Sequence, residues 1–261
     1  MRNSYGLRWL FLVSALIVAI EMSACAMVGA LPFGGDSWKE EVLLHDGSKV
    51  VVERKVERGG RHEVGQPSPI KEHTVTFTLS HTGQTITWTS EYDESLGRTN
   101  FHLLAVHVLN GTPYIVTEPN LCLSYNKWGR PNPPYVFFKY DGTAWQRIPL
   151  EAVPTEFITL NVAISLDTRY VRDMVSRRVV PAETIRERNS QLPQPEYKTI
   201  LREPVKSGGS QCGEMIHVGN GRWIGTGWFR DQPSRDACFK YCEQKNVPAS
   251  QCPCATLFKE E

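Results

Sequence analysis

The residues of this sequence best able to do chemistry are its cysteines. Apart from Cys25, six cysteines follow position 120, at Cys122, Cys212, Cys238, Cys242, Cys252 and Cys254. An even number in an exported chain indicates disulfide bonds, and their crowding near one end indicates a small appendage too short to build much core. The sequence therefore predicts a disulfide-rich C-terminal subdomain over residues 207–261.

The spacing of the last four cysteines suggests how they pair. Cys238 and Cys242 lie one turn apart on a helix expected over about 235–245, with Ser234 as its N-cap. Cys252 and Cys254 would point the same way on an extended backbone, at a similar spacing of about 6–7 Å. A chain returning antiparallel would form two nested bridges, Cys238 to Cys254 and Cys242 to Cys252. Cys122 and Cys212 are then left to pair, although either could be a buried free thiol.

Two other chemistries are open to these thiols. Cys-x3-Cys suits zinc, but Cys-x-Cys does not, and an oxidising compartment competes with metal binding. Redox catalysis at Cys252-Pro253-Cys254 would need a neighbour that lowers a thiol pKa, and the adjoining sequence has no basic residue for this. We expect no metal and no cofactor.

A second group of residues has the chemistry of a binding surface. Tyr125, Trp128, Arg130 and Tyr135 lie in a stretch with three prolines, and their rings could form a platform for a sugar ring or a peptide. Arg130 could engage a carboxylate or a phosphate. The alternative is that these side chains brace the fold.

Catalytic signatures are weak. The seven histidines have no metal-ligand spacing, and no nucleophile elbow, phosphate loop or His-Glu-x-x-His motif occurs. His62 beside Glu63 is the best acid-base pair, yet a glycine-bearing loop there is typical of solvated surface. We expect a non-enzymatic protein, with a hydrolase or other envelope enzyme built from loops as the alternative.

The N-terminus has the order of a secretory signal. Arg2 and Arg8 precede a mostly apolar run that ends in small residues, so residues 1–24 are predicted to be a signal peptide. The run is shorter than the roughly 20 residues that span a bilayer, which argues against a retained membrane helix.

Met22-Ser23-Ala24-Cys25 resembles a bacterial lipobox, in which the cysteine thiol receives a diacylglyceryl group. This resemblance implies lipidation of Cys25, a tether over residues 25–36 and attachment to the membrane through the lipid. Ala26 after the cysteine implies the periplasmic side of the outer membrane. Plain cleavage after Ala26 or Ala30, giving a soluble periplasmic protein, is the alternative.

Charge argues against nucleic acid as a partner. The chain has a formal charge of +1, and loss of Arg2, Arg8 and Glu21 with the signal leaves it neutral. Nucleic-acid-binding proteins cluster Lys and Arg to displace counterions. The basic stretches 54–61 and 169–188 are interrupted by acids and are typical of solvated faces.

The body of the chain predicts a mainly β fold. Turn pairs Asp46-Gly47, Asn110-Gly111 and Asp141-Gly142 separate alternating apolar and β-branched runs over residues 37–165. Nine or ten strands follow one another in hairpins, and threonines would line the wet side of residues 73–89. We expect an antiparallel meander closed as a barrel or folded as a sandwich. A fragment of a β-propeller is the alternative, although the sequence has no repeat at the period of a propeller blade.

Three segments complete this expectation. A short strand at 122–124 precedes an extended loop over 125–134, and 157–164 is predicted to be the last strand. Residues 166–206 should hold two helices, over 167–179 and 182–189, followed by a proline-bounded strap.

Several motifs between Ser37 and Glu203 carry a family resemblance: Ser37-Trp38-Lys39-Glu40-Glu41, His45-Asp46-Gly47-Ser48, Arg58-Gly59-Gly60-Arg61-His62-Glu63, the run 123–140, Trp145-Gln146-Arg147-Ile148-Pro149-Leu150 and Pro195-Glu196-Tyr197-Lys198-Thr199-Ile200. In these the chain resembles an uncharacterised family of exported proteobacterial proteins, many with lipoprotein-type leaders. The resemblance implies export and a shared fold, and supplies no mechanism. The cysteine-rich end is an addition beyond the shared body.

Together these features predict a cell-envelope lipoprotein that binds or assembles with an envelope protein or glycan.

Overall fold

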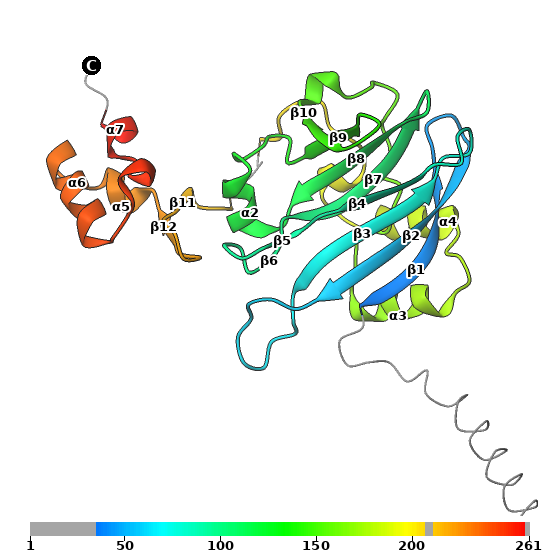
Figure 1. The fold of residues 1–261 in the computed structure, drawn as a ribbon, viewed down its shortest axis with the longest axis horizontal. Helices are drawn as coiled ribbons and strands as arrows, with labels where there is room; N and C mark the ends of the chain where they lie inside the picture. The colour runs from blue at the N-terminus through cyan, green and yellow to red at the C-terminus, as the bar shows by residue number, and fades with distance from the viewer. Residues whose placement is uncertain (1–34, 207–210, 259–261) are drawn as a thin grey trace, which may run out of the picture. The chain divides into compact units, whose positions relative to one another are not determined.

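The computed structural model describes residues 35–206 and 211–258 (Figure 1). The predicted signal peptide over 1–24, Cys25 and nearly all of the predicted tether lie outside the described residues. Within the described ranges, no helix has both the length and the apolar character needed to cross a bilayer. The fold is mainly β, with antiparallel sheets and short helices, as the sequence predicts.

The first sheet has four strands in sequence order: β1 (Asp36–Leu43), β2 (Lys49–Arg58), β3 (Ile70–Thr78) and β4 (Thr85–Thr89). Each strand alternates buried and exposed residues, because one face covers the core and the other meets water. The predicted Asp46-Gly47 turn joins β1 and β2, with the Asp46 carboxylate accepting from the Ser48 backbone N–H at 2.9 Å.

The second sheet also follows the chain, in the spatial order β10-β9-β8-β7: β7 (Phe101–Leu109), β8 (Thr112–Pro119), β9 (Val136–Tyr140) and β10 (Trp145–Ile148). Asn110 and Gly111 both take positive φ, at 51° and 77°, as a type I′ turn requires. At the β9–β10 hairpin Gly142 has φ 105°, and the Asp141 carboxylate accepts from the N–H groups of Thr143 and Ala144. A small separate hairpin, β5 (Tyr92–Asp93) and β6 (Arg98–Thr99), lies in the connection between β4 and β7.

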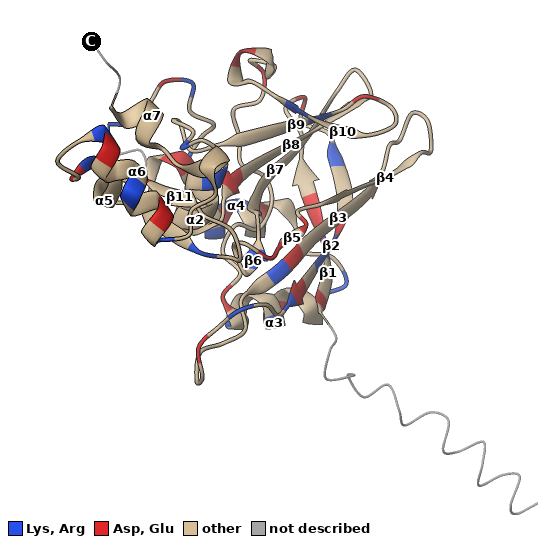
Figure 2. Ribbon diagram, turned by 60° about the vertical axis from the view of Figure 1, so that its left-hand side comes forward, with Lys and Arg blue, Asp and Glu red and all other residues tan. Residues whose placement is uncertain are grey.

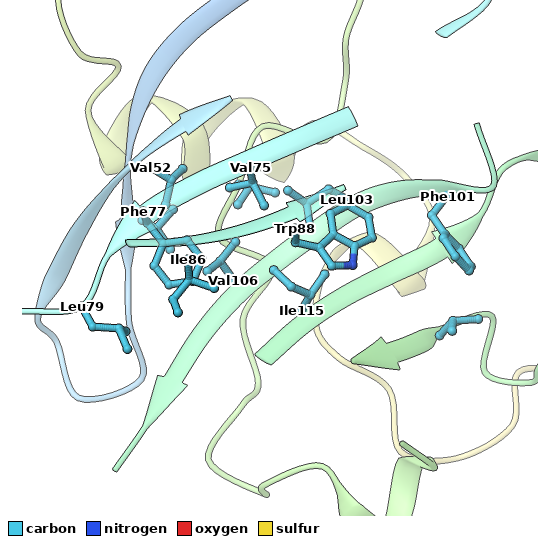
Figure 3. Close-up of a cluster of buried hydrophobic side chains, with 13 residues drawn as sticks. Val52, Val75, Phe77, Leu79, Ile86, Trp88, Phe101, Leu103, Val106 and Ile115 are labelled. Atoms are coloured by element: carbon cyan, nitrogen blue, oxygen red, sulfur yellow. The ribbon is translucent and has the colours of Figure 1, made fainter. Parts of the chain in front are cut away.

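The two sheets share one hydrophobic core. Its buried residues come from both sheets and include Val52, Val75, Phe77, Ile86, Trp88, Phe101, Leu103, Val106 and Ile115 (Figure 3). Since the hydrogen-bonded ladders end at β4 and at β7, the sheets are separate layers and do not close into one barrel.

The opposite face of the second sheet is covered by irregular chain. Phe157 is fully buried there and stacks on His107, with ring centroids 4.4 Å apart. The predicted strand over 157–164 is wrong, because this segment joins neither sheet. The Asn161 side chain bonds this segment to β7: its amide oxygen accepts from Val106 N–H at 3.0 Å, and its amide nitrogen donates to the oxygen of Val106 at 2.8 Å.

Short helices complete the body: η1 (Leu150–Ala152), α3 (Thr168–Ser176), α4 (Ala182–Ser190) and η2 (Pro195–Tyr197). Apolar residues of α3 and α4 pack with Trp38 and Val56 of the first sheet in a third buried cluster. In the stretch 169–188, predicted to be a solvated face, Asp173 binds both Arg177 and Arg188. In the other such stretch, 54–61, the prediction is wrong for Arg54, which is fully buried in an ion pair with Glu40. Figure 2, in which the ribbon is coloured by residue type, shows basic and acidic residues interspersed along the chain.

A helix replaces the strand predicted at 122–124. It is α2 (Leu121–Lys127), which buries Ser124 and Tyr125 on one face. The Asn126 amide donates to the carbonyl of Cys122, one turn earlier, at 2.8 Å. The predicted strand failed because three residues of alternation are too few to separate strand from helix, and this stretch has no β-branched residue.

The C-terminal region is a small disulfide-rich unit with its own buried cluster. Its elements are β11 (Met215–His217), β12 (Trp223–Gly225), α5 (Gly227–Arg230), α6 (Arg235–Gln244), η3 (Ala249–Gln251) and α7 (Cys254–Leu257). Ser234 caps α6 as predicted, accepting from the Ala237 N–H at 3.2 Å. Val218 and Phe229 pack around the buried cysteines of α6 and α7.

Candidate functional site: an aromatic cleft at Trp128

The four residues predicted to form a binding platform do not lie on one surface. Tyr125 and Tyr135 are buried, with 7% and 4% of their surface exposed. The Tyr135 hydroxyl donates to the backbone oxygens of Glu196 at 2.7 Å and Thr199 at 3.1 Å. Burial raises the pKa of Tyr135 well above its usual value, so the phenol stays protonated. Both tyrosines therefore serve as packing groups.

Arg130 braces the attachment of the C-terminal region. Its guanidinium lies over the ring of Tyr125, 5.1 Å from the centroid, and donates to the carbonyl oxygen of Cys212 at 2.9 Å. A second donor nitrogen reaches the Asn126 side chain at 3.0 Å. Arg130 thus holds the chain at Cys212 beside α2, where Cys212 is bonded to Cys122.

Trp128, unlike the buried Tyr125 and Tyr135, borders a cavity of the described chain. It ends α2, where its indole N–H donates to the Asn100 side-chain oxygen at 3.1 Å. Its ring packs on Phe101, with centroids 4.5 Å apart. The cavity beside it has a volume of about 380 Å³, and ten residues line it: Thr87, Trp88, Thr89, Ser90, Glu91, Asn100, Phe101, Trp128, Phe138 and Trp145. We call it the aromatic cleft.

Strand β10 supplies Trp145 to the lining of the aromatic cleft and places Arg147 over the ring of Trp128. The indole N–H of Trp145 donates to the backbone oxygen of Thr87 at 2.8 Å, which joins β10 to the edge strand β4. Arg147 lies two residues further on the same strand face, 5.4 Å above the ring of Trp128. Sequence reasoning did not select Trp145 or Arg147 as binding residues. Their i, i+2 spacing after the Asp141-Gly142 turn is the signal that places both on one face.

Polar groups converge at one end of the aromatic cleft. The Asn100 side-chain oxygen accepts from Lys127 Nζ at 3.2 Å as well as from Trp128. Lys127 forms an ion pair with Asp93, and desolvation lowers its pKa. Glu91 is exposed, has φ 59°, and its carboxylate makes no hydrogen bond to the rest of the described chain. The aromatic cleft thus joins aromatic faces to an amide, hydroxyls and an exposed carboxylate.

Two titratable groups away from the aromatic cleft, Glu118 and Tyr197, bind each other. The Tyr197 hydroxyl contacts both carboxylate oxygens of Glu118, at 2.7 and 2.8 Å. Burial raises the pKa of Glu118 to about 7 and lowers the pKa of His102, its partner across β7 and β8, to about 4. His62, the acid-base candidate, is exposed, and its ring nitrogen Nδ1 lies 2.9 Å from the backbone oxygen of Gly60.

The cysteines pair as their spacing suggests. The structure contains the disulfides Cys122–Cys212, Cys238–Cys254 and Cys242–Cys252. The route differs from the expected extended one, since Cys252 follows η3 and Cys254 begins α7. The sulfurs of Cys242, Cys252 and Cys254 lie within 4.8 Å of one another, but each is already bonded in a disulfide and is therefore no thiolate ligand.

We compared the chain with known proteins, and no protein-family model, no curated protein and no solved structure matches it.

Proposed function

We propose that this protein is a non-enzymatic binding component of the bacterial cell envelope, and that its aromatic cleft holds a sugar ring of an envelope glycan. The observation that carries the proposal is the arrangement of Trp128 and Trp145 along one cavity beside Asn100 and Glu91. Sugar rings have apolar faces that stack on indoles and equatorial hydroxyls that bond to amides and carboxylates. A pocket of this kind combines apolar walls with a few placed polar groups.

The setting in the envelope has separate support. The signal-like N-terminus and the resemblance at Cys25 indicate export and a lipid anchor on the periplasmic side of the outer membrane. Three disulfides are in keeping with an oxidising compartment. An envelope protein that presents a polar side chain and a ring to the aromatic cleft is the alternative partner.

Binding is tested by titrating the purified mature protein with muropeptides and with lipopolysaccharide core oligosaccharides, monitored by calorimetry. We expect one of the two to bind saturably. Trp145→Ala should weaken that binding by about tenfold or more, because stacking on an aromatic ring contributes on the order of 1–2 kcal/mol.

The matched control for this titration is Trp228→Ala. Trp228 is a tryptophan with 65% of its surface exposed, and it does not line the aromatic cleft. Its loss should leave glycan affinity unchanged. Wild-type protein that binds neither glycan, or Trp145→Ala protein that keeps full affinity with normal thermal unfolding, would refute the glycan proposal.

The anchor is tested by labelling cells with radioactive palmitate. Label should appear in the wild-type protein and should be lost in Cys25→Ser, which removes the acceptor thiol. A mature protein that begins at residue 27 or 31 without label would show plain cleavage and a soluble periplasmic protein.

A further inference from the structure

A second cavity, of about 260 Å³, lies between α4, the end of β1 and the chain at 159–161. We call it the α4 cavity. It shares no lining residue with the aromatic cleft. Its lining residues are Leu43, Thr159, Leu160, Asn161, Ala182, Glu183, Ile185, Arg186, Asn189, Ser190, Tyr197 and Lys198.

The walls of the α4 cavity offer an occupant mainly hydrocarbon surface. Leu43, Leu160 and Ile185 supply aliphatic surface. The two asparagines have their amides committed to the backbone: Asn161 donates to the oxygen of Leu43 at 2.9 Å, and Asn189 donates to the oxygen of Val162 at 2.8 Å. An occupant of this space gains from removing hydrocarbon from water and finds few polar partners inside.

Positively charged side chains outnumber negatively charged ones around the α4 cavity. Glu183 shares Lys49 with Glu41, since Lys49 Nζ lies 3.1 Å from the Glu183 carboxylate and 2.9 Å from that of Glu41. Against the one acid Glu183, the lining residues include two bases, Arg186 and Lys198. Lys198 donates to the carbonyl oxygen of Ser190 at 2.5 Å, and no carboxylate among the described residues forms an ion pair with it. Arg186 is exposed and makes no hydrogen bond within the described chain, and its charge helps to lower the pKa of Glu183. The rim can therefore receive an anion.

From this combination we infer that the α4 cavity binds a single-chain amphiphile with an anionic head. The tail fills the apolar space, and a carboxylate or phosphate meets Arg186 and Lys198. A cavity of 150 Å³ holds one benzene, so by proportion this volume accommodates about ten carbon atoms.

Tail length is tested by calorimetry of the purified protein with a series of saturated fatty acids below their micelle concentrations. Affinity should rise about fourfold for each added methylene up to about ten carbons, and should then level off because further methylenes remain in water. Decyl phosphate in place of decanoate shows which head the rim prefers. Absence of saturable binding for both heads overturns the inference.

The charged rim is tested by comparing decanoate with decanol. Decanoate should bind up to about fivefold more tightly, and Arg186→Ala should remove most of this preference while leaving decanol binding unchanged. Arg178→Ala, an exposed arginine that does not line the α4 cavity, should have no effect. Equal affinities of wild type for the two ligands would contradict the role of the rim.

Occupancy is tested with a pair of matched serines. Ser190 ends α4 and Ser176 ends α3, and each hydroxyl donates to the carbonyl three residues earlier, at 2.6 and 2.7 Å. Only Ser190 lines the α4 cavity. Ser190→Trp should reduce decanoate affinity at least tenfold, whereas Ser176→Trp and Trp145→Ala should not. Unchanged binding in a folded Ser190→Trp protein would show that the amphiphile binds elsewhere.

Discussion

At the scale of single residues, the most constrained groups are two buried charges. Glu40 and Arg54 have no exposed surface, and their side chains meet at 3.0 Å. Glu40 also accepts from the indole N–H of Trp38 at 2.7 Å and from the backbone N–H of Ala163 at 3.2 Å. A buried charge is tolerated only when it is paired and hydrogen-bonded. The pair therefore ties β1 and β2 to the irregular segment of residues 157–164.

Glu118 makes the stability of the protein depend on pH. Its pKa is raised from near 4.5 to about 7, so the folded protein keeps a proton that the unfolded chain releases at lower pH. The free energy of unfolding should therefore fall as pH rises from about 4.5, and the stabilisation that the Glu118 proton gives should be gone above about pH 7. Relative to Glu118→Gln, wild type should lose up to about 3 kcal/mol between pH 5 and pH 8.

Urea unfolding of wild type and Glu118→Gln at both pH values measures this difference. The comparison is needed because the lowered pKa values of His73, His102 and His107 produce the opposite trend in acid. Glu53→Gln, an exposed glutamate on the outer face of β2, is the control. If the stability difference between wild type and Glu118→Gln is the same at both pH values, Glu118 is not protonated near neutrality.

At the scale of elements, threonine pairs cover the outer face where β3 meets β4. Thr76 faces Thr87 with hydroxyls 3.0 Å apart, and Thr78 faces Thr85 at 3.1 Å. Cross-strand pairs of this kind stabilise a sheet on its wet side. The alternation of threonine with apolar residues predicted this face.

Asn161 determines how the irregular segment joins the second sheet. In Asn161→Leu, the N–H and oxygen of Val106 and the oxygen of Leu43 would lose their partner, and each buried unpaired group costs about 1–3 kcal/mol. We expect a loss of about 2–4 kcal/mol in unfolding free energy, measured in urea. Gln146→Leu, an exposed amide bonded to Asp141, should cost less than about 1 kcal/mol. Equal losses in the two variants would show that Asn161 is replaceable.

At the scale of the whole molecule, the Cys122–Cys212 disulfide closes a loop of 90 residues that contains β9, β10, α3 and α4. The stabilisation from a disulfide grows with the loop it closes. The double variant Cys122→Ala/Cys212→Ala should lose about 2–4 kcal/mol in unfolding free energy of the body. Cys242→Ala/Cys252→Ala, which opens a loop of 10 residues in the C-terminal region, should leave the body unchanged.

Fluorescence from the body is the measurement, with urea unfolding of both double variants under the same non-reducing conditions. Each double variant removes two cysteines and one disulfide, so the two variants differ only in which loop is opened. Equal midpoints for the two double variants would mean that the long bridge does not stabilise the body.

The sequence by itself determined the features that depend on near neighbours. Turn pairs such as Asn110-Gly111 placed the hairpins, because few residues tolerate the positive φ that those turns need. Alternating apolar residues assigned the inner face of each strand. The cysteine partners followed from helical and extended spacing, although the chain between Cys252 and Cys254 is not extended.

Only the tertiary structure decided that residues 157–164 join no sheet and where the cavities form. Residues 157–164 have a strand-like pattern, but an asparagine amide takes the hydrogen bonds that a strand would have made. The aromatic cleft joins β4, the start of β7, the end of α2 and β10. No local spacing encodes such a meeting, because it arises when two separate sheets pack over one core and bring distant rings to the same edge.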